Sequence, residues 1–150
     1  MPHLKYIMVD GPDGAGKGEI INSIEEFLMC NDFHFISTSE PTKSGMGGFI
    51  REIMITGQKM YSAAETARAF AADRKCHMKN VVLPALNKGT IVAQDRGLPS
   101  SLAYQTAQAY FENEILTIEE IFKPGREQNS HGKCPWTDSG PKCFRWNSHE

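Results

Sequence analysis

The stretch that decides the fold is GPDGAGK, residues 11–17, which separates an apolar run from an amphipathic one. Residues 5–9 (KYIMV) are almost continuously apolar, as expected of a strand buried in a parallel sheet. Apolar residues between positions 20 and 28 then recur at helical spacing and stop before Asn31. Two glycines and a lysine in the pattern G-x-x-x-x-G-K, between a strand and a helix, are typical of a phosphate-binding loop.

A loop of this kind binds phosphate through its backbone N–H groups, the dipole of the following helix and the charge of its lysine. The alternative, a glycine-rich turn with a solvated lysine, is disfavoured by the strand and the helix on either side. We therefore expect the loop to bind the phosphates of ATP. The predicted ATP-binding residues are Gly11, Pro12, Asp13, Gly14, Ala15, Gly16, Lys17 and Gly18.

Two residues after the loop depart from the pattern. Gly18 stands where a serine or threonine hydroxyl normally binds Mg²⁺. Glu19 places a carboxylate where triphosphate charge would accumulate, although an acidic residue in the first helical turn also stabilises a helix by about 0.3–1 kcal/mol. Both residues weaken the case for efficient handling of Mg·ATP.

The rest of the chain alternates strands with helices. Residues 33–37 (FHFIS) and 90–93 (TIVA) are predicted strands, and residues 49–56, 63–79 and 98–110 are predicted helices, with a kink at Pro84. This alternation predicts a P-loop-type three-layer α/β/α fold with a parallel sheet and helices on both faces. Sheets of this kind have about five or six strands. We therefore expect a fold truncated after the third strand.

The composition is that of one ordinary soluble domain. The 150 residues carry a net charge of -2, and 40% are hydrophobic. This excludes a basic nucleic-acid binder, and no apolar run is long enough for a membrane helix. Without a signal-peptide pattern, a cytoplasmic protein with four reduced cysteines is expected.

The composition changes near Phe122. Residues 1–122 have a net charge of -4, whereas residues 123–150 have +2 and contain no Val, Ile, Leu, Ala or Met. We expect a working domain over residues 1–122 and a poorly ordered tail over residues 123–150. The spacing of His131, Cys134, Cys143 and His149 fits no zinc finger.

Two further clusters carry residues suited to binding. The first cluster is Phe70, Asp73 and Arg74. Its ring and guanidinium share one helix face, where a flat base could stack on the ring and accept from the guanidinium, although an aromatic in an alanine-rich stripe is more often core. Asp95 and Arg96 follow the third strand at its carboxyl end, where open α/β sheets bind ligands. This position favours a phosphate and metal site over a surface ion pair.

Five segments together resemble the thymidylate kinases. They are DGPDGAGKG, SEP, IREI, FAADRKCHMKNVVLPALNKGTIVAQDR and SSLAYQ, and the likeness runs over residues 5–122, 118 of 150. The resemblance implies transfer of the γ-phosphoryl group of ATP to dTMP, giving dTDP, with Mg²⁺ as cofactor. It also implies pairing as a homodimer, and the composition predicts neither a nucleic acid nor a membrane as partner.

The resemblance also implies roles for individual residues. Arg51 and Arg96 would hold the acceptor phosphate, Asp95 would lie near the metal, and Lys17, Asp95 and Arg96 would be the catalytic residues. Phe70 would stack on thymine. The remaining expected substrate contacts are Arg74 to the base, Asp13 to the sugar 3′-hydroxyl, and Tyr104 near the 2′ position, with Ser101 and Gln105 along the same wall.

Three features depart from the family. Gly18 and Glu19 replace hydroxyl residues, and Gly97 replaces the aromatic that usually follows Asp-Arg. The family's next strand, arginine-bearing lid, adenine loop and closing helix have no counterpart after Phe122, as a frame change or truncation would produce. Impaired kinase activity is therefore expected. A non-catalytic nucleotide-binding remnant and a P-loop kinase for another nucleoside monophosphate remain alternatives.

Overall fold

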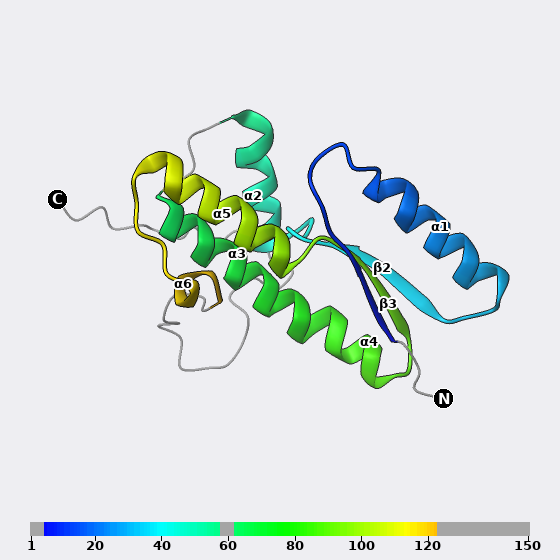
Figure 1. Cartoon of the computed structure of the whole chain (residues 1–150). Coiled ribbons are helices and arrows are strands. Elements are labelled where there is room, and N and C mark those ends of the chain that lie inside the picture. Colours follow the sequence, from blue (N-terminus) through cyan, green and yellow to red (C-terminus); the bar gives the residue numbers. More distant parts are fainter. Residues whose placement is uncertain (1–4, 58–61, 123–150) are drawn as a thin grey trace, which may run out of the picture.

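The computed structural model describes residues 5–57 and 62–122. Strands and helices alternate along these residues, and Figure 1 shows them in chain order. The elements are β1 (Tyr6–Val9), α1 (Lys17–Cys30), β2 (Phe35–Ser39), α2 (Gly45–Thr56), α3 (Ala63–His77), the π-helix η1 (Met78–Val82), α4 (Leu83–Asn87), β3 (Ile91–Asp95), α5 (Leu98–Glu112) and α6 (Ile118–Phe122).

The sheet consists of three parallel strands in the order β1-β3-β2. Val92 and Ala93 of the central strand are fully buried. The register pairs Val9 with Asp95 on one side and Ser39 with Asp95 on the other, so all three strands end level with one another. The carboxyl ends of parallel strands are where α/β sheets bind ligands, so a ligand site is expected at the loops that follow these three residues.

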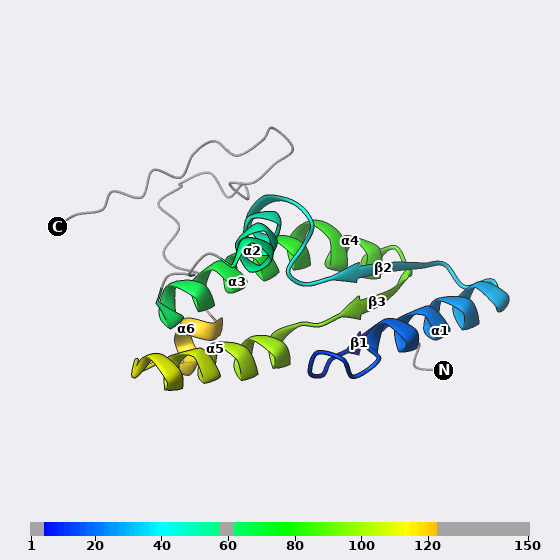
Figure 2. The ribbon, with the colours of Figure 1, turned by 90° about the horizontal axis from the view of Figure 1, so that it is seen from above.

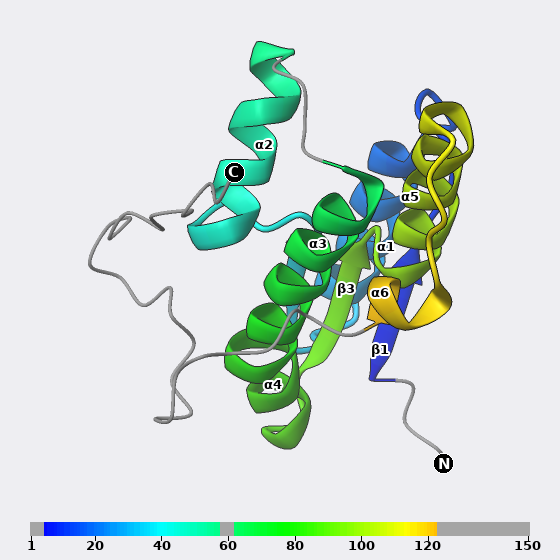
Figure 3. The ribbon, with the colours of Figure 1, turned by 90° about the vertical axis from the view of Figure 1, so that its left-hand side faces the viewer.

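Helices cover both faces of the sheet. Figure 3 shows β3 between α3 and α1, and Figure 2, seen from above, also places α1 on the side opposite α3 and α4. Ile50, Val82 and Val92 are completely buried and belong to the core. The predicted three-layer α/β/α architecture is confirmed.

The predicted strand boundaries were wrong by a few residues. The second strand begins at Phe35 instead of residue 33, because the N–H of Phe33 still closes α1 by donating to the carbonyl oxygen of Leu28 at 2.9 Å. The third strand runs on to Asp95 instead of residue 93. It includes buried Gln94, whose side chain accepts from Tyr6 Oη at 2.9 Å, so an apolar-run criterion ends the strand too early.

Two helix predictions also needed correction. Helix α2 begins at Gly45 instead of residue 49, since its glycines allow the first turn to pack closely against the backbone of Thr42. The long helix is α-helical only to His77 and then widens into the π-helical turn η1. Pro84 lies in the first turn of α4, where the missing N–H costs little, so the wider turn accommodates the proline.

Two expectations from composition have different outcomes. Cys30 is an exposed free thiol, but Cys76 is disulfide-bonded, so the expectation of four reduced cysteines was wrong for Cys76. Within residues 5–57 and 62–122, no helix is long and apolar enough to cross a membrane. The tail over residues 123–150 lies outside the described residues. It includes the two histidines and two cysteines that were considered as zinc ligands.

Candidate functional site

The GPDGAGK loop joins β1 to α1 as predicted. Gly14 and Gly16 have φ angles of 79° and 75°, a left-handed conformation that favours glycine. The N–H of Ala15 donates to the carbonyl oxygen of Pro12 at 3.3 Å, and Lys17 Nζ donates to the same oxygen at 2.7 Å. The lysine therefore folds back over its own loop, which concentrates positive charge at the start of α1.

Asp10 ties this loop to the start of α5, a role that the sequence did not reveal. Its carboxylate accepts from the N–H groups of Gly11 at 2.8 Å, Gly97 at 3.2 Å and Ser100 at 3.0 Å, and from the Ser100 hydroxyl. Partial burial opposes ionisation of Asp10, but the hydrogen bonds from Ser100, Gly11 and Gly97 outweigh it and lower the pKa of the carboxyl.

The structure brings Asp13, Arg96 and Tyr104 together at the carboxyl edge of the sheet. Arg96 Nη2 forms an ion pair with Asp13 Oδ1, and Tyr104 Oη donates to Asp13 Oδ2 at 3.1 Å. The Arg96 guanidinium lies 5.6 Å from the centre of the Tyr104 ring, within the range of a cation–π interaction. Its Nη1 donates to Gly11 O at 3.3 Å and to Ser100 Oγ at 3.0 Å, so the guanidinium is fixed beside the loop.

Asp95 offers an oxygen suited to a cation. Its Oδ1 is buried and makes no hydrogen bond within the described ranges. A buried carboxylate oxygen without a partner is unusual, and Mg²⁺ prefers oxygen ligands of this kind. Position 18 supplies no such oxygen, although a Cβ built on Gly18 would meet no atom within 4 Å. The donor set thus fits Mg²⁺ through Asp95 but lacks a hydroxyl on the helix.

Arg51 of α2 lies at the end of β2. Its Nε donates to the carbonyl oxygens of Pro41 at 2.8 Å and Thr42 at 3.2 Å, and its Nη2 donates to Ser39 Oγ at 3.1 Å. Since Ser39 pairs in register with Asp95, Arg51 is held at the same sheet edge as Arg96. Arg51 and Arg96, the two arginines expected to bind phosphate, therefore lie at the same carboxyl edge of the sheet although different elements carry them.

Arg74 of α3 meets Ser101 of α5 farther along this edge. Its Nη2 donates to Ser101 Oγ, and its Nε donates to Glu40 Oε2 at 3.0 Å. Phe70 lies one turn earlier on α3 and is half-buried. Gln105 is 3% exposed, and its Oε1 is another buried oxygen without a partner in the described part of the chain.

Asp73 holds the loop between β2 and α2, which was also not predicted. Its Oδ2 accepts from the N–H of Thr42 at 2.8 Å and its Oδ1 from the Thr42 hydroxyl at 2.6 Å. Burial raises the pKa of Asp73, and the Thr42 hydrogen bonds offset only part of this effect. Because the carbonyl oxygen of Thr42 also accepts from Arg51, Asp73 connects α3 to the end of the site that holds Arg51. The only sequence signal was its place between Phe70 and Arg74.

The replacement of the family's aromatic by Gly97 has a local explanation. A Cβ at Gly97 would lie 2.6 Å from Met8 Sδ and 3.3 Å from Gln94 Nε2. The space that a larger side chain would enter is therefore already filled by Met8. The main effect of Gly97 is on packing at the end of the sheet.

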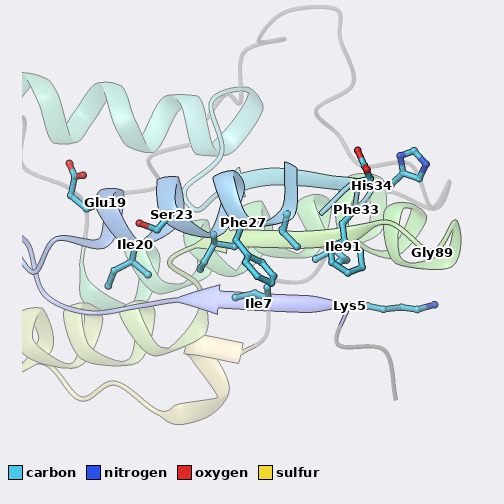
Figure 4. Close-up of a pocket in the computed structure, with 13 residues that line it drawn as sticks. Lys5, Ile7, Glu19, Ile20, Ser23, Phe27, Phe33, His34, Gly89 and Ile91 are labelled. Atoms are coloured by element: carbon cyan, nitrogen blue, oxygen red, sulfur yellow. The ribbon is translucent and has the colours of Figure 1, made fainter. Parts of the chain in front are cut away.

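A separate cavity of about 990 Å³ lies between α1 and the sheet (Figure 4). Apolar side chains dominate its lining, among them Ile7, Ile20, Phe27 and Ile91. Glu19 lies at its rim, but the arginines at the sheet edge and Asp10, Asp13 and Asp95 do not line it. The cavity is therefore distinct from the candidate site, which is an open edge ringed by charged groups.

Comparison with known proteins agrees with this geometry. Residues 9–124 match the family model described as thymidylate kinase. The chain belongs to the thymidylate kinase family. The matched span contains the phosphate-binding loop and every charged residue placed at the sheet edge above.

Individual thymidylate kinases support the assignment. The chain is 35% identical over 118 residues to a thymidylate kinase of Clostridium novyi, covering 77% of this chain and 58% of that protein. It is 40% identical over 101 residues to one of Finegoldia magna, covering 67% and 50%. The crystal structure of thymidylate kinase from Ehrlichia chaffeensis aligns with a TM-score of 0.55 at 26% identity, over 67% of this chain and 57% of that one. The chain thus spans little more than half the length of these relatives.

Proposed function

We propose that this protein binds dTMP and transfers the γ-phosphoryl group of ATP to it, giving dTDP. The observation that carries the proposal is the position of Arg96, which lies at the carboxyl end of the central strand and is paired with Asp13 of the phosphate-binding loop. One guanidinium thereby touches the loop for the donor phosphates and faces the edge where an acceptor would bind.

The acceptor end of the site suits a pyrimidine nucleotide. Arg96 and Arg51 supply two guanidinium groups for the acceptor phosphate. Arg74 can only donate hydrogen bonds, so it selects a base edge that presents a carbonyl oxygen. Tyr104 and Asp13 lie beside Arg96 and would contact the sugar.

The donor end of the site offers fewer groups to bind ATP and Mg²⁺ than the acceptor end offers for dTMP. Lys17 and the loop N–H groups would hold ATP phosphates, and Asp95 Oδ1 would hold Mg²⁺. Bound Mg²⁺ neutralises phosphate charge during phosphoryl transfer. Gly18 contributes no oxygen and Glu19 adds a negative charge nearby, so we infer that the kinase activity of this chain is impaired. These two residues favour a nucleotide-binding remnant as the second candidate function.

Location and assembly are inferred from the sequence pattern and the family resemblance. We infer a cytoplasmic protein that acts on free nucleotides, with neither a nucleic acid nor a membrane as partner. The family resemblance supports a homodimer. Sedimentation of the purified chain would test the homodimer.

The first experiment is a titration of the 150-residue chain with dTMP, dUMP, UMP and AMP in a calorimeter. We expect dTMP to bind most tightly, because Arg74 matches a carbonyl-bearing base and Tyr104 crowds the sugar. A coupled assay with dTMP, ATP and Mg²⁺ then separates the two candidate functions. Binding without turnover supports the remnant, whereas tightest binding of AMP would exclude a thymidylate kinase.

A further inference from the structure

Glu40 shares its two carboxylate oxygens between two partners. It lies just beyond β2, is 5% exposed, and has no expected role at the site. Its Oε2 accepts from Arg74 Nε at 3.0 Å, and its Oε1 lies 3.1 Å from His77 Nδ1. A buried carboxylate needs partners on both oxygens, and here α3 supplies both from consecutive turns.

His77 is fixed on both sides of its ring. It is 3% exposed, and its Nε2 lies 2.6 Å from Thr38 Oγ1. An ionised carboxylate only accepts, so His77 Nδ1 carries the proton that is shared with Glu40. In the neutral ring, Nε2 then accepts from the Thr38 hydroxyl, which sets both the tautomer and the ring plane.

The same carboxylate sets the plane of Arg74. The guanidinium is planar, so contacts at Nε, to Glu40, and at Nη2, to Ser101, define its orientation. The Arg74 side chain is 16% exposed, and Nη1 makes no hydrogen bond within residues 5–57 and 62–122. That nitrogen is the donor left for a ligand.

We propose that His77 is a positioning residue for recognition of the nucleotide base, acting through Glu40 on Arg74; this rests on the proposed binding of dTMP. His77 occupies Oε1 of Glu40 and thereby leaves only Oε2 for Arg74. Without the imidazole, both oxygens can pair side by side with Nε and Nη2 of Arg74. That pairing draws Nη2 away from Ser101 and turns the guanidinium away from the base.

The test compares dTMP with 5-methyl-dCMP, which replaces the carbonyl at position 4 of the base by an amino group. His77→Phe keeps a ring of similar size but removes the donor to Glu40. We expect it to weaken dTMP binding about tenfold and to reduce the preference for dTMP over 5-methyl-dCMP by a similar factor. His77→Asn keeps an N–H near the Nδ1 position, so it should restore most of the preference. In turnover assays, KM for dTMP should rise more than kcat falls.

His34→Phe is the matched control, because His34 is exposed and lines the separate cavity under α1. It should leave dTMP affinity and base preference unchanged. If His77→Phe fails to fold by circular dichroism, Thr38→Val carries the test, since it loosens the ring and keeps both charged partners. Thr38→Val should shift the base preference in the same direction by a smaller factor.

The outcomes separate this proposal from the proposed function. If the unmodified chain binds no dTMP, the proposed function fails and the role of His77 fails with it. If the chain binds dTMP and Arg74→Ala loses affinity, but folded His77→Phe keeps the base preference, only the role of His77 is overturned. An equal loss of affinity for both nucleotides in His77→Phe would also overturn it, because that is the result of a purely structural role. Should His77→Phe not fold, an unchanged preference in Thr38→Val overturns the proposal.

Discussion

Arg96 is the side chain on which the proposed acceptor site depends most. We expect Arg96→Ala to weaken dTMP binding by about 1.5–3 kcal/mol, because it removes charge-assisted hydrogen bonds to phosphate. Calorimetry with dTMP measures the change. Arg68→Ala is the matched control, since Arg68 forms an exposed ion pair with Glu120. Equal affinities of the Arg96 and Arg68 variants would remove Arg96 from the site.

Variants at Tyr104 distinguish a steric role of its ring from a hydrogen-bonding role of its hydroxyl. Its ring packs over Arg96 while its hydroxyl contacts Asp13. Tyr104→Ala should narrow the affinity gap between dTMP and its ribonucleotide, because a smaller side chain admits the 2′-hydroxyl. Tyr104→Phe keeps the ring and should keep the gap. Competition binding with both nucleotides measures it, and Tyr110→Ala, at an 80% exposed tyrosine on the same helix, serves as control. If Tyr104→Ala leaves the affinity difference between dTMP and its ribonucleotide unchanged, Tyr104 has only a packing role.

Sequence patterns found the residues of the site better than their supports. The glycine-lysine spacing predicted the loop that holds Lys17, and the end of the third strand predicted the place of Asp95 and Arg96. Both segments lie at one edge because the parallel strands β1 and β3 end level with one another. Asp10 and Glu40 were missed because their roles depend on contacts more than 30 residues apart along the chain, which no local period reveals.

At the level of elements, the first turn of α2 packs tightly on the loop that holds Arg51. A Cβ on Gly47 would overlap the backbone nitrogen of Thr42, which cannot rotate away. Gly47→Ala should therefore lower the free energy of unfolding by about 1–3 kcal/mol, as overpacking does. Denaturant unfolding measures the change. Gly18→Ala is the matched helical glycine, with open space around it, and should leave stability unchanged or raise it by up to about 1 kcal/mol. Equal effects of the two variants would contradict the packing argument.

The tie between the phosphate-binding loop and α5 predicts a pH dependence. The pKa of Asp10 is lowered in the folded state from 3.8, so its ionised form stabilises the fold fully above pH 3.8. As pH falls below 3.8, the unfolded state takes up the proton first, and the contribution disappears as pH passes through the lowered folded pKa. Asp10→Asn should be less stable than the unmodified chain at pH 7, and this difference should shrink below pH 3.8. Urea unfolding at pH 7 and near pH 3 measures both, and a difference independent of pH would contradict the role of the charge.

Element types were predicted better than element ends. Helix and strand periods identified the β1–loop–α1 unit and the long helix through Phe70 and Arg74. The ends were missed where a polar residue is buried in a strand, as at Gln94, or where glycines start a helix, as at Gly45. The π-helical turn before Pro84 had no sequence signal beyond the proline itself, because widening a turn depends on the packing of both flanking helices.

On the scale of the whole molecule, positive charge is unevenly distributed between the two ends of the site. Of the arginines in residues 5–57 and 62–122, Arg51 and Arg74 are held at the acceptor side, and Arg68 pairs with Glu120. Among these four described arginines, Arg96 alone contacts the phosphate-binding loop. The proposed acceptor half of the site therefore has more arginines than the proposed donor half, as the sequence analysis also predicted.

This imbalance predicts that the 150-residue chain binds dTMP better than it uses ATP. An arginine that stabilises a transferring phosphoryl group is worth about 10³–10⁵ in rate, and complete kinases turn over at about 1–100 s⁻¹. With Lys17 and Arg96 as the cations at the loop, turnover should lie several orders of magnitude below that range. Gly18→Thr should tighten Mg·ATP binding, because the open space at position 18 admits a hydroxyl, but it should leave turnover low. A coupled assay with dTMP, ATP and Mg²⁺ measures both variants, with Gly18→Ala as control. Turnover of about 1 s⁻¹ or more in the unmodified chain would show that residues outside the described part, or a second subunit, supply the charge that the described donor side lacks.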